Sequence, residues 1–393
     1  MPTFSTLRGV ALAFLVAACG TTSRLEPVPS AVAAKAVIPG FADIRYFVPA
    51  DSERLAAEYD RSVLRELKVA GKLAPRDLPT AHFLALSGGA DDGAFGAGLL
   101  EGWTEAGTRP RFKLVTGIST GALIAPFAFL GPSYDPQLKE LFTTINAQAV
   151  FRQRSIAAAL TDDGLADTTP LFGLISKHLD EEMLSRIAAE YDKGRLLLIM
   201  TTDLDAARPV IWNIGAIAKH GGPEALKTIR RVLLASASIP GAFAPVMFDV
   251  TYEGKPYQEL HVDGGAVAQS FLYTPGVHLS QTGRKRVAYI IRNQRLLPSP
   301  EKVDRQTMSI AGRAISVMIV ANGLGDTYRM YATTQRDKVD FNLAFIGSDF
   351  TVPYPSMFDQ GYMRALFDYG FKKAREGYPW QKAPPGLLTK AEG

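Results

Sequence analysis

The chain has 393 residues, of which 47% are hydrophobic and 21% charged, and its formal net charge at pH 7 is +4. A chain of this size and composition can hold itself together by core burial. The basic residues are scattered along it, which leaves nucleic-acid binding without support. A single cysteine excludes a disulfide framework and a cysteine-based metal site.

The first 20 residues have the pattern of an export signal. Arg8 precedes an apolar run over 9–18 that is too short to span a bilayer, and the only cysteine, Cys19, comes directly after it. Small residues followed by this cysteine resemble the bacterial lipoprotein signal, in which the cysteine is lipidated and becomes the first residue of the mature protein. By that resemblance Gly20 favours sorting to the outer membrane. We therefore expect a signal peptide over 1–18 and a lipid-anchored protein that faces the periplasm, with an ordinary secretory signal as the alternative.

The segments that follow differ in their patterning. Residues 19–40 are rich in Thr, Ser, Pro and Ala, which is typical of a tether. Residues 41–79 form an expected helical extension, in which Asp51 and Ser52 cap a helix with an apolar face. The expected strands cover 82–86, 113–117, 195–200, 209–213, 246–252, 257–262 and 286–291, and the expected helices cover 93–106, 120–130, 223–237, 308–331 and 356–377. This alternation predicts one α/β domain over 80–377, a three-layer α/β/α fold with a mainly parallel central sheet, followed by a tail over 378–393.

A serine lies between two of these elements, in Gly117-Ile-Ser-Thr-Gly121. An apolar run over 112–116 precedes the pentapeptide and another over 122–130 follows it. A serine on a turn between strand and helix is the arrangement of a nucleophile elbow, so we expect Ser119 to be a catalytic nucleophile. The alternative is a small residue that merely fits a tight turn.

Two glycine-rich segments accompany this serine. A loop over 87–93 enters the helix that begins near Gly93, and Asp263 is followed by Gly264 and Gly265. A serine hydroxyl needs a neighbouring base, and a carboxylate can serve if burial raises its proton affinity. Backbone N–H groups of a glycine loop at a helix start can stabilise an oxyanion. The alternative for the aspartate is a turn residue that closes a hairpin.

Four blocks in order resemble the patatin-like phospholipases: 86–98, 117–121, 236–243 and 263–265. The resemblance covers about residues 80–375 and implies a lipid acyl hydrolase that acts on phospholipids or related esters through an acyl-enzyme. It implies a dyad of Ser119 and Asp263 without histidine, an oxyanion hole at Gly88 and Gly89, and no cofactor or metal. The motif glycines carried over are Gly93, Gly117, Gly121, Gly264 and Gly265.

The glycine loop departs from the family pattern at two positions. Ala90 replaces a third consecutive glycine, and Asp92 replaces a basic residue. We expect Asp91 or Asp92 to cap the helix that begins at Gly93. Two alternatives stay open. One is a conventional Ser-Asp-His triad, for which only His278 follows Asp263 in the chain; the other is a non-catalytic envelope lipoprotein with a disabled oxyanion loop.

Overall fold

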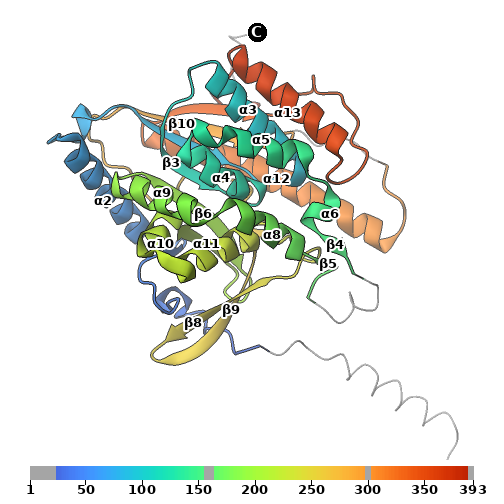
Figure 1. The fold of residues 1–393 in the computed structure, drawn as a ribbon, viewed down its shortest axis with the longest axis horizontal. Helices are drawn as coiled ribbons and strands as arrows, with labels where there is room; N and C mark the ends of the chain where they lie inside the picture. The colour runs from blue at the N-terminus through green and yellow to red at the C-terminus, as the bar shows by residue number, and fades with distance from the viewer. Residues whose placement is uncertain (1–23, 155–162, 297–301, 388–393) are drawn as a thin grey trace, which may run out of the picture.

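The computed structural model describes residues 24–154, 163–296 and 302–387. The expected signal peptide and the lipidation site at Cys19 lie outside the described residues. The described part is an α/β/α fold with one large mixed sheet (Figure 1). No helix among the described residues is long and apolar enough to cross a membrane.

The sheet is parallel at its centre and antiparallel at one side. Its strands follow the spatial order β1 (Arg45–Phe47), β7 (Arg208–Asn213), β6 (Leu196–Asp203), β3 (Phe112–Gly117), β2 (Ala81–Leu86), β10 (Arg286–Arg292) and β11 (Asp340–Phe345). The pairs from β6 to β11 are parallel, whereas β1–β7 and β6–β7 are antiparallel. A hairpin of β8 (Val246–Tyr252) and β9 (Lys255–Asp263) joins the sheet where β9 pairs with the end of β6. A separate two-stranded sheet pairs β4 (Arg152–Gln153) with β5 (Ala166–Asp167). This register confirms the mainly parallel sheet predicted from the sequence.

Helices cover both faces of the sheet. One face carries α3 (Gly93–Glu105), α4 (Thr120–Leu130), α5 (Asp135–Thr144), α6 (Ala147–Val150), α8 (Thr169–His178), α9 (Glu181–Asp192), α10 (Ile214–His220), α11 (Gly222–Ser236) and α13 (Gln360–Arg375). The other face carries α2 (Ser52–Ala70) and the second half of α12 (Thr307–Arg336). Short 3-10 turns lie at Ala33–Lys35, Pro75–Asp77, Ala90–Asp92, Pro132–Tyr134 and Gly264–Ala266.

Side chains of β2 point alternately into two hydrophobic cores, one on each face of the sheet. Leu84 and Leu86 belong to the core under α3 and α4, whereas Phe83 and Ala85 belong to the core under α2 and α12. Successive side chains of a strand point to opposite faces, so a strand that is apolar throughout must be covered on both sides. Four fully buried residues in succession meet that requirement.

The fold extends past the expected boundaries at both ends. Val28, Ala33 and Ala36 are buried, and the backbone of Val37 pairs with Thr251 of β8, so residues 24–38 pack against the hairpin where a tether was expected. Strand β1 of the expected helical extension is part of the large sheet. In the expected tail, Gln381 pairs with Leu343 of β11. These segments are mainly polar in composition, but the apolar residues within them are buried against the fold and stabilise the packing.

The helix starts differ from the expected caps. Asp51 precedes α2, but its carboxylate accepts the Phe47 N–H at 2.8 Å and an Arg54 N–H at 2.9 Å and makes no cap hydrogen bond. Helix α13 begins after Asp359, whose Oδ1 accepts the Tyr362 N–H at 2.8 Å. The expected start near Ser356 is therefore three residues too early.

Candidate functional site

Ser119 occupies the turn between β3 and α4, as the sequence predicts. Its φ of 55° and ψ of −126° place it in a region that non-glycine residues seldom adopt. A Cβ at Gly121 would lie 2.3 Å from the Leu86 carbonyl oxygen, so only glycine allows α4 to approach β2 this closely. Such backbone strain occurs where the surrounding structure enforces it, and a nucleophile elbow is one such place.

A second serine holds the elbow in place. The Ser119 N–H donates to Ser236 Oγ at 3.0 Å, and the Ser236 hydroxyl donates to the Met200 carbonyl at 2.7 Å. Ser236 is fully buried at the end of α11. The block over 236–243 carries part of the family resemblance, but its sequence does not indicate this positioning role of Ser236.

Asp263 ends β9 and is brought to the elbow by the sheet. It pairs with Thr201 of β6 and is 4% exposed. Burial raises its pKa to about 7, and this rise is opposed by the Ser119 hydroxyl, which interacts with the carboxyl, and by a 2.6 Å hydrogen bond from the Gly265 N–H. A carboxyl with this pKa can take up a proton near neutral pH.

The glycines after Asp263 make this approach possible. A Cβ at Gly264 would lie 2.7 Å from the Met200 carbonyl oxygen and 3.1 Å from the Ile118 side chain. Real Cβ atoms do not approach backbone oxygen at such a distance, so a side chain here would push β9 away from the elbow. Gly265 follows in the same 3-10 turn. The backbone therefore passes close to the elbow at Gly264.

The glycine loop lies against Ser119, but its donors differ from those expected. A Cβ at Gly88 would lie 3.2 Å from the Ser119 Cβ. The Gly88 N–H, however, donates to the Gln269 carbonyl at 3.0 Å and is therefore already used. Among the described residues, the N–H groups of Gly89, Ala90 and Thr120 have no hydrogen-bond partner. This hydrogen bond disfavours Gly88 as an oxyanion donor, and the assignments to Gly88 and Gly89 stay predictions.

Asp91 and Asp92 do not cap α3, contrary to expectation. The Asp91 carboxylate accepts the Phe358 N–H at 2.7 Å, and the Asp92 carboxylate accepts the Tyr362 hydroxyl at 2.8 Å. Burial raises the pKa of Asp92 to about 7. The two carboxyls fasten the glycine loop to the segment before α13 and to the first turn of α13, because their partners Phe358 and Tyr362 are there and not at the start of α3. Gly93, the first residue of α3, packs against Thr120.

Gln269 links the two loops beside Ser119. Its carbonyl accepts the Gly88 N–H, and its side-chain amide donates to the Gly265 carbonyl at 2.8 Å. Its own N–H donates to Asp326 Oδ2 of α12 at 2.6 Å. No motif in the sequence indicates Gln269 or Asp326, because their roles depend on backbone contacts between distant segments.

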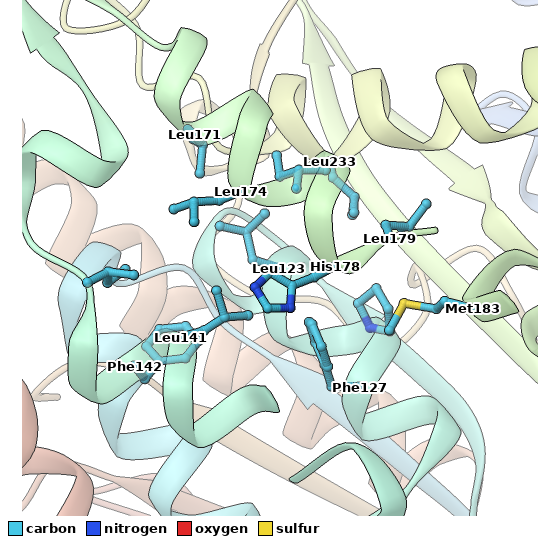
Figure 2. Close-up of a pocket in the computed structure, with 13 residues that line it drawn as sticks. Leu123, Phe127, Leu141, Phe142, Leu171, Leu174, His178, Leu179, Met183 and Leu233 are labelled. Carbon is cyan, nitrogen blue, oxygen red and sulfur yellow. The ribbon is translucent and has the colours of Figure 1, made fainter. Parts of the chain in front are cut away.

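An apolar cavity lies on the other side of the elbow helix (Figure 2). Its volume is about 60 Å³. Helices α4, α5, α8, α9 and α11 line it, with Leu123, Phe127, Leu174, His178, Met183 and Leu233 among the lining side chains. Leu123 lies one helical turn from Ser119, and Leu233 lies one turn from Ser236. The cavity therefore begins one turn from the nucleophile on α4 and one turn from the positioning serine Ser236 on α11.

The histidines bear on the conventional triad. All five are within the described residues, and none of them hydrogen bonds with Ser119 or Asp263. His278 is exposed. His261, two residues before Asp263, has its ring between Thr201 at 2.8 Å and Glu259 at 3.1 Å. The geometry thus offers the serine a carboxylate and no imidazole.

His261 does belong to a group of possible metal ligands that the sequence analysis did not foresee. Ligand atoms of Asp203, Glu259 and His261 all lie within 4.8 Å of one another. The Arg45 guanidinium also reaches Glu259, with one N–H···O distance of 3.0 Å, and holds the pKa of that carboxyl at about 2 despite its burial. The Arg45 cation compensates the negative charge of Glu259, so we interpret the cluster as a buried ion-pair network.

The sequence is similar to that of one known protein family. Residues 84–272 match the family model of the patatin-like phospholipases. No curated protein sequence matches the chain. Among solved structures, VipD from Legionella pneumophila superposes with a TM-score of 0.39 and 11% sequence identity, over 77% of this chain and 67% of that one. Over residues 84–272, the chain carries a patatin-like phospholipase domain.

Proposed function

We propose that the protein is a serine lipid acyl hydrolase of the phospholipase A or lysophospholipase type, with Ser119 as nucleophile and Asp263 as general base. The observation that carries this proposal is the strained, 8% exposed Ser119 beside a buried carboxyl whose pKa is about 7. The patatin-like domain supports lipid acyl hydrolysis in general. The apolar cavity one turn from Ser119 is lined by hydrophobic side chains and, at about 60 Å³, has room for only the first carbons of an acyl chain.

The reaction proceeds in two halves. Ionised Asp263 removes the Ser119 hydroxyl proton as Oγ attacks the acyl carbonyl, and the N–H groups of Gly89, Ala90 and Thr120 are the candidates for donation to the resulting oxyanion. The protonated carboxyl then returns its proton to the departing alkoxide, which leaves an acyl-Ser119 ester. In the second half Asp263 deprotonates a water molecule that cleaves this ester, and the proton returns to Ser119.

A fluorophosphonate probe tests the nucleophile. We expect one adduct, located at Ser119 by peptide mass spectrometry, and no adduct in Ser119→Ala. The control variant is Ser280→Ala, which changes an exposed serine of the loop before β10 and leaves labelling intact. Absence of a Ser119 adduct in the folded protein would favour the non-catalytic lipoprotein instead. A large loss of turnover in His278→Ala would favour a conventional triad.

We also propose that the mature protein is acylated at Cys19 and held at the outer membrane, facing the periplasm. The support is the apolar run over 9–18 that ends at the only cysteine of the chain. Metabolic labelling with a fatty-acid analogue tests this proposal. Label is expected in the parent protein and absent in Cys19→Ser, and an unlabelled parent would contradict the anchor.

A further inference from the structure

The first half of α12 is an apolar helix that is not covered by the described fold. Residues 310–322 are exposed or half-buried throughout. Ile310, Ile315, Val317 and Met318 are between 46% and 56% exposed. In Figure 1 this orange end of α12 reaches the edge of the molecule. A run of large apolar side chains in water marks a binding surface more often than a chance exposure.

The second half of the same helix is anchored beside the nucleophile. Asp326 accepts the N–H of Gln269, whose carbonyl holds Gly88 against Ser119. A Cβ at Gly323 would lie within 2 Å of the buried Arg292 side chain, so α12 packs tightly there. The helix is thus fixed at the site and presents its apolar half outward from it.

A second exposed apolar segment is fastened to the glycine loop. Val352, Tyr354 and Met357 are 40%, 52% and 46% exposed. The segment that carries them is held by Asp91, which accepts the Phe358 N–H at 2.7 Å and the Tyr354 hydroxyl at 3.5 Å. Two uncovered apolar segments, far apart in sequence, are therefore each tied to a loop that adjoins Ser119.

The charges near α12 indicate the partner. Just before α12, the exposed Lys302 and Arg305 stand on either side of a single acidic residue, Asp304. Apolar side chains flanked by cations suit the surface of a bilayer with anionic headgroups, in which the apolar groups enter the acyl boundary and the cations meet phosphate. A second copy of the chain would instead bring the same cations together.

We propose that the first half of α12, together with residues 352–357, forms a docking face that places the active-site entrance on a phospholipid bilayer. This inference rests on the proposed function, because a phospholipase must draw its substrate from a lipid surface. It assigns the recognition of the lipid aggregate to these two segments. The Cys19 anchor would only keep the protein near the membrane.

The test uses the single cysteine of the chain. Cys19→Ser yields a full-length protein without cysteine, into which Met318→Cys places an environment-sensitive nitrobenzoxadiazole label. Leu73→Cys, at a side chain 97% exposed after α2, is the control. On addition of phosphatidylethanolamine–phosphatidylglycerol vesicles, we expect a blue shift of the Met318 label and none at Leu73. No shift at Met318 would overturn the proposal, as would a shift without vesicles that grows with protein concentration, which would indicate self-association.

A second measurement separates docking from catalysis. In Ile315→Asp/Met318→Asp, vesicle partitioning is expected to fall by about tenfold for each side chain removed from the lipid. Hydrolysis of vesicle phospholipid should fall with it, whereas hydrolysis of soluble p-nitrophenyl butyrate is retained. Ser119→Ala should lose both hydrolyses and keep the fluorescence shift. A parent that hydrolyses neither substrate would contradict the proposed function, and the label would still decide the docking face.

Discussion

Replacing Asp263 by asparagine should stabilise the fold while it abolishes hydrolysis. Asparagine has nearly the same shape, and its side-chain oxygen can still accept the Gly265 N–H. It cannot remove a proton from Ser119. The substitution therefore separates the cost of burying a carboxylate from the benefit of having a base.

The size of the effect follows from the pKa of Asp263. Burial raises this pKa from 3.8 to about 7. Each pH unit of difference corresponds to about 1.4 kcal/mol, so ionised Asp263 costs the folded state up to about 4 kcal/mol. Between these two pKa values the folded protein keeps a proton that the unfolded chain has lost. The free energy of unfolding of the parent relative to that of Asp263→Asn is therefore greatest below the lower pKa. It falls as the pH rises and reaches its minimum above about pH 7.

Urea unfolding of both proteins across this range measures the difference. We expect Asp263→Asn to gain up to about 4 kcal/mol over the parent between about pH 4 and pH 8. All other titrating groups are shared, so they cancel in the comparison. A difference that does not depend on pH, or a parent that gains on the variant as the pH rises, would refute the burial argument.

Three further predictions concern turnover. Hydrolysis of p-nitrophenyl butyrate should increase with pH through about 7 as Asp263 ionises. The variant Asp92→Asn removes another carboxyl with a pKa of about 7 and should leave that inflection in place. If the inflection disappeared in this variant, it would belong to Asp92. Asp326→Ala should lower kcat by about tenfold with KM unchanged, because Gln269 loses its acceptor, and Asp326→Asn should restore most of it; a change in KM alone would contradict a positioning role. Leu123→Phe should lower kcat/KM for long-chain p-nitrophenyl esters by about tenfold relative to the acetate; an equal loss for both would exclude the cavity as the acyl site.

The elements whose apolar pattern is local could be predicted from the sequence. Strands β2, β3, β6 and β10 lie where their continuous apolar runs predict them, because both faces of each are buried. Helix α12 runs without a break through Gly323 and Gly325, and the absence of a side chain at Gly323 gives room to Arg292. Strand β11 was missed because Asp340–Phe345 has no turn signal of its own and is defined by its pairing with β10.

The residues of the candidate site also fall into two groups, those that the local sequence reveals and those that it does not. Ser119 and Asp263 are marked by glycines that the backbone requires at those positions, so local sequence reveals them. The use of the Gly88 N–H depends on a carbonyl 181 residues later, that of Gln269. Likewise, the cation of Arg45 reaches Glu259 across 214 residues. Contacts of this kind are set by how the sheet brings its strands together, and no local pattern encodes them.

The departures of the glycine loop from the patatin-like pattern have a structural explanation. A carboxylate at Asp92 would oppose an oxyanion if it faced Ser119, yet it is bound by Tyr362 and its pKa is raised to about 7, so much of it is neutral at physiological pH. Asp91 is held by Phe358 in the same way. Asp91 thus binds the segment that bears Tyr354 and Met357, and Asp92 binds the first turn of α13 directly after it. These contacts join the loop that lies against the nucleophile to the surface that we propose binds the lipid. The aspartates of this loop therefore couple it to the docking face, and they do not point at the oxyanion.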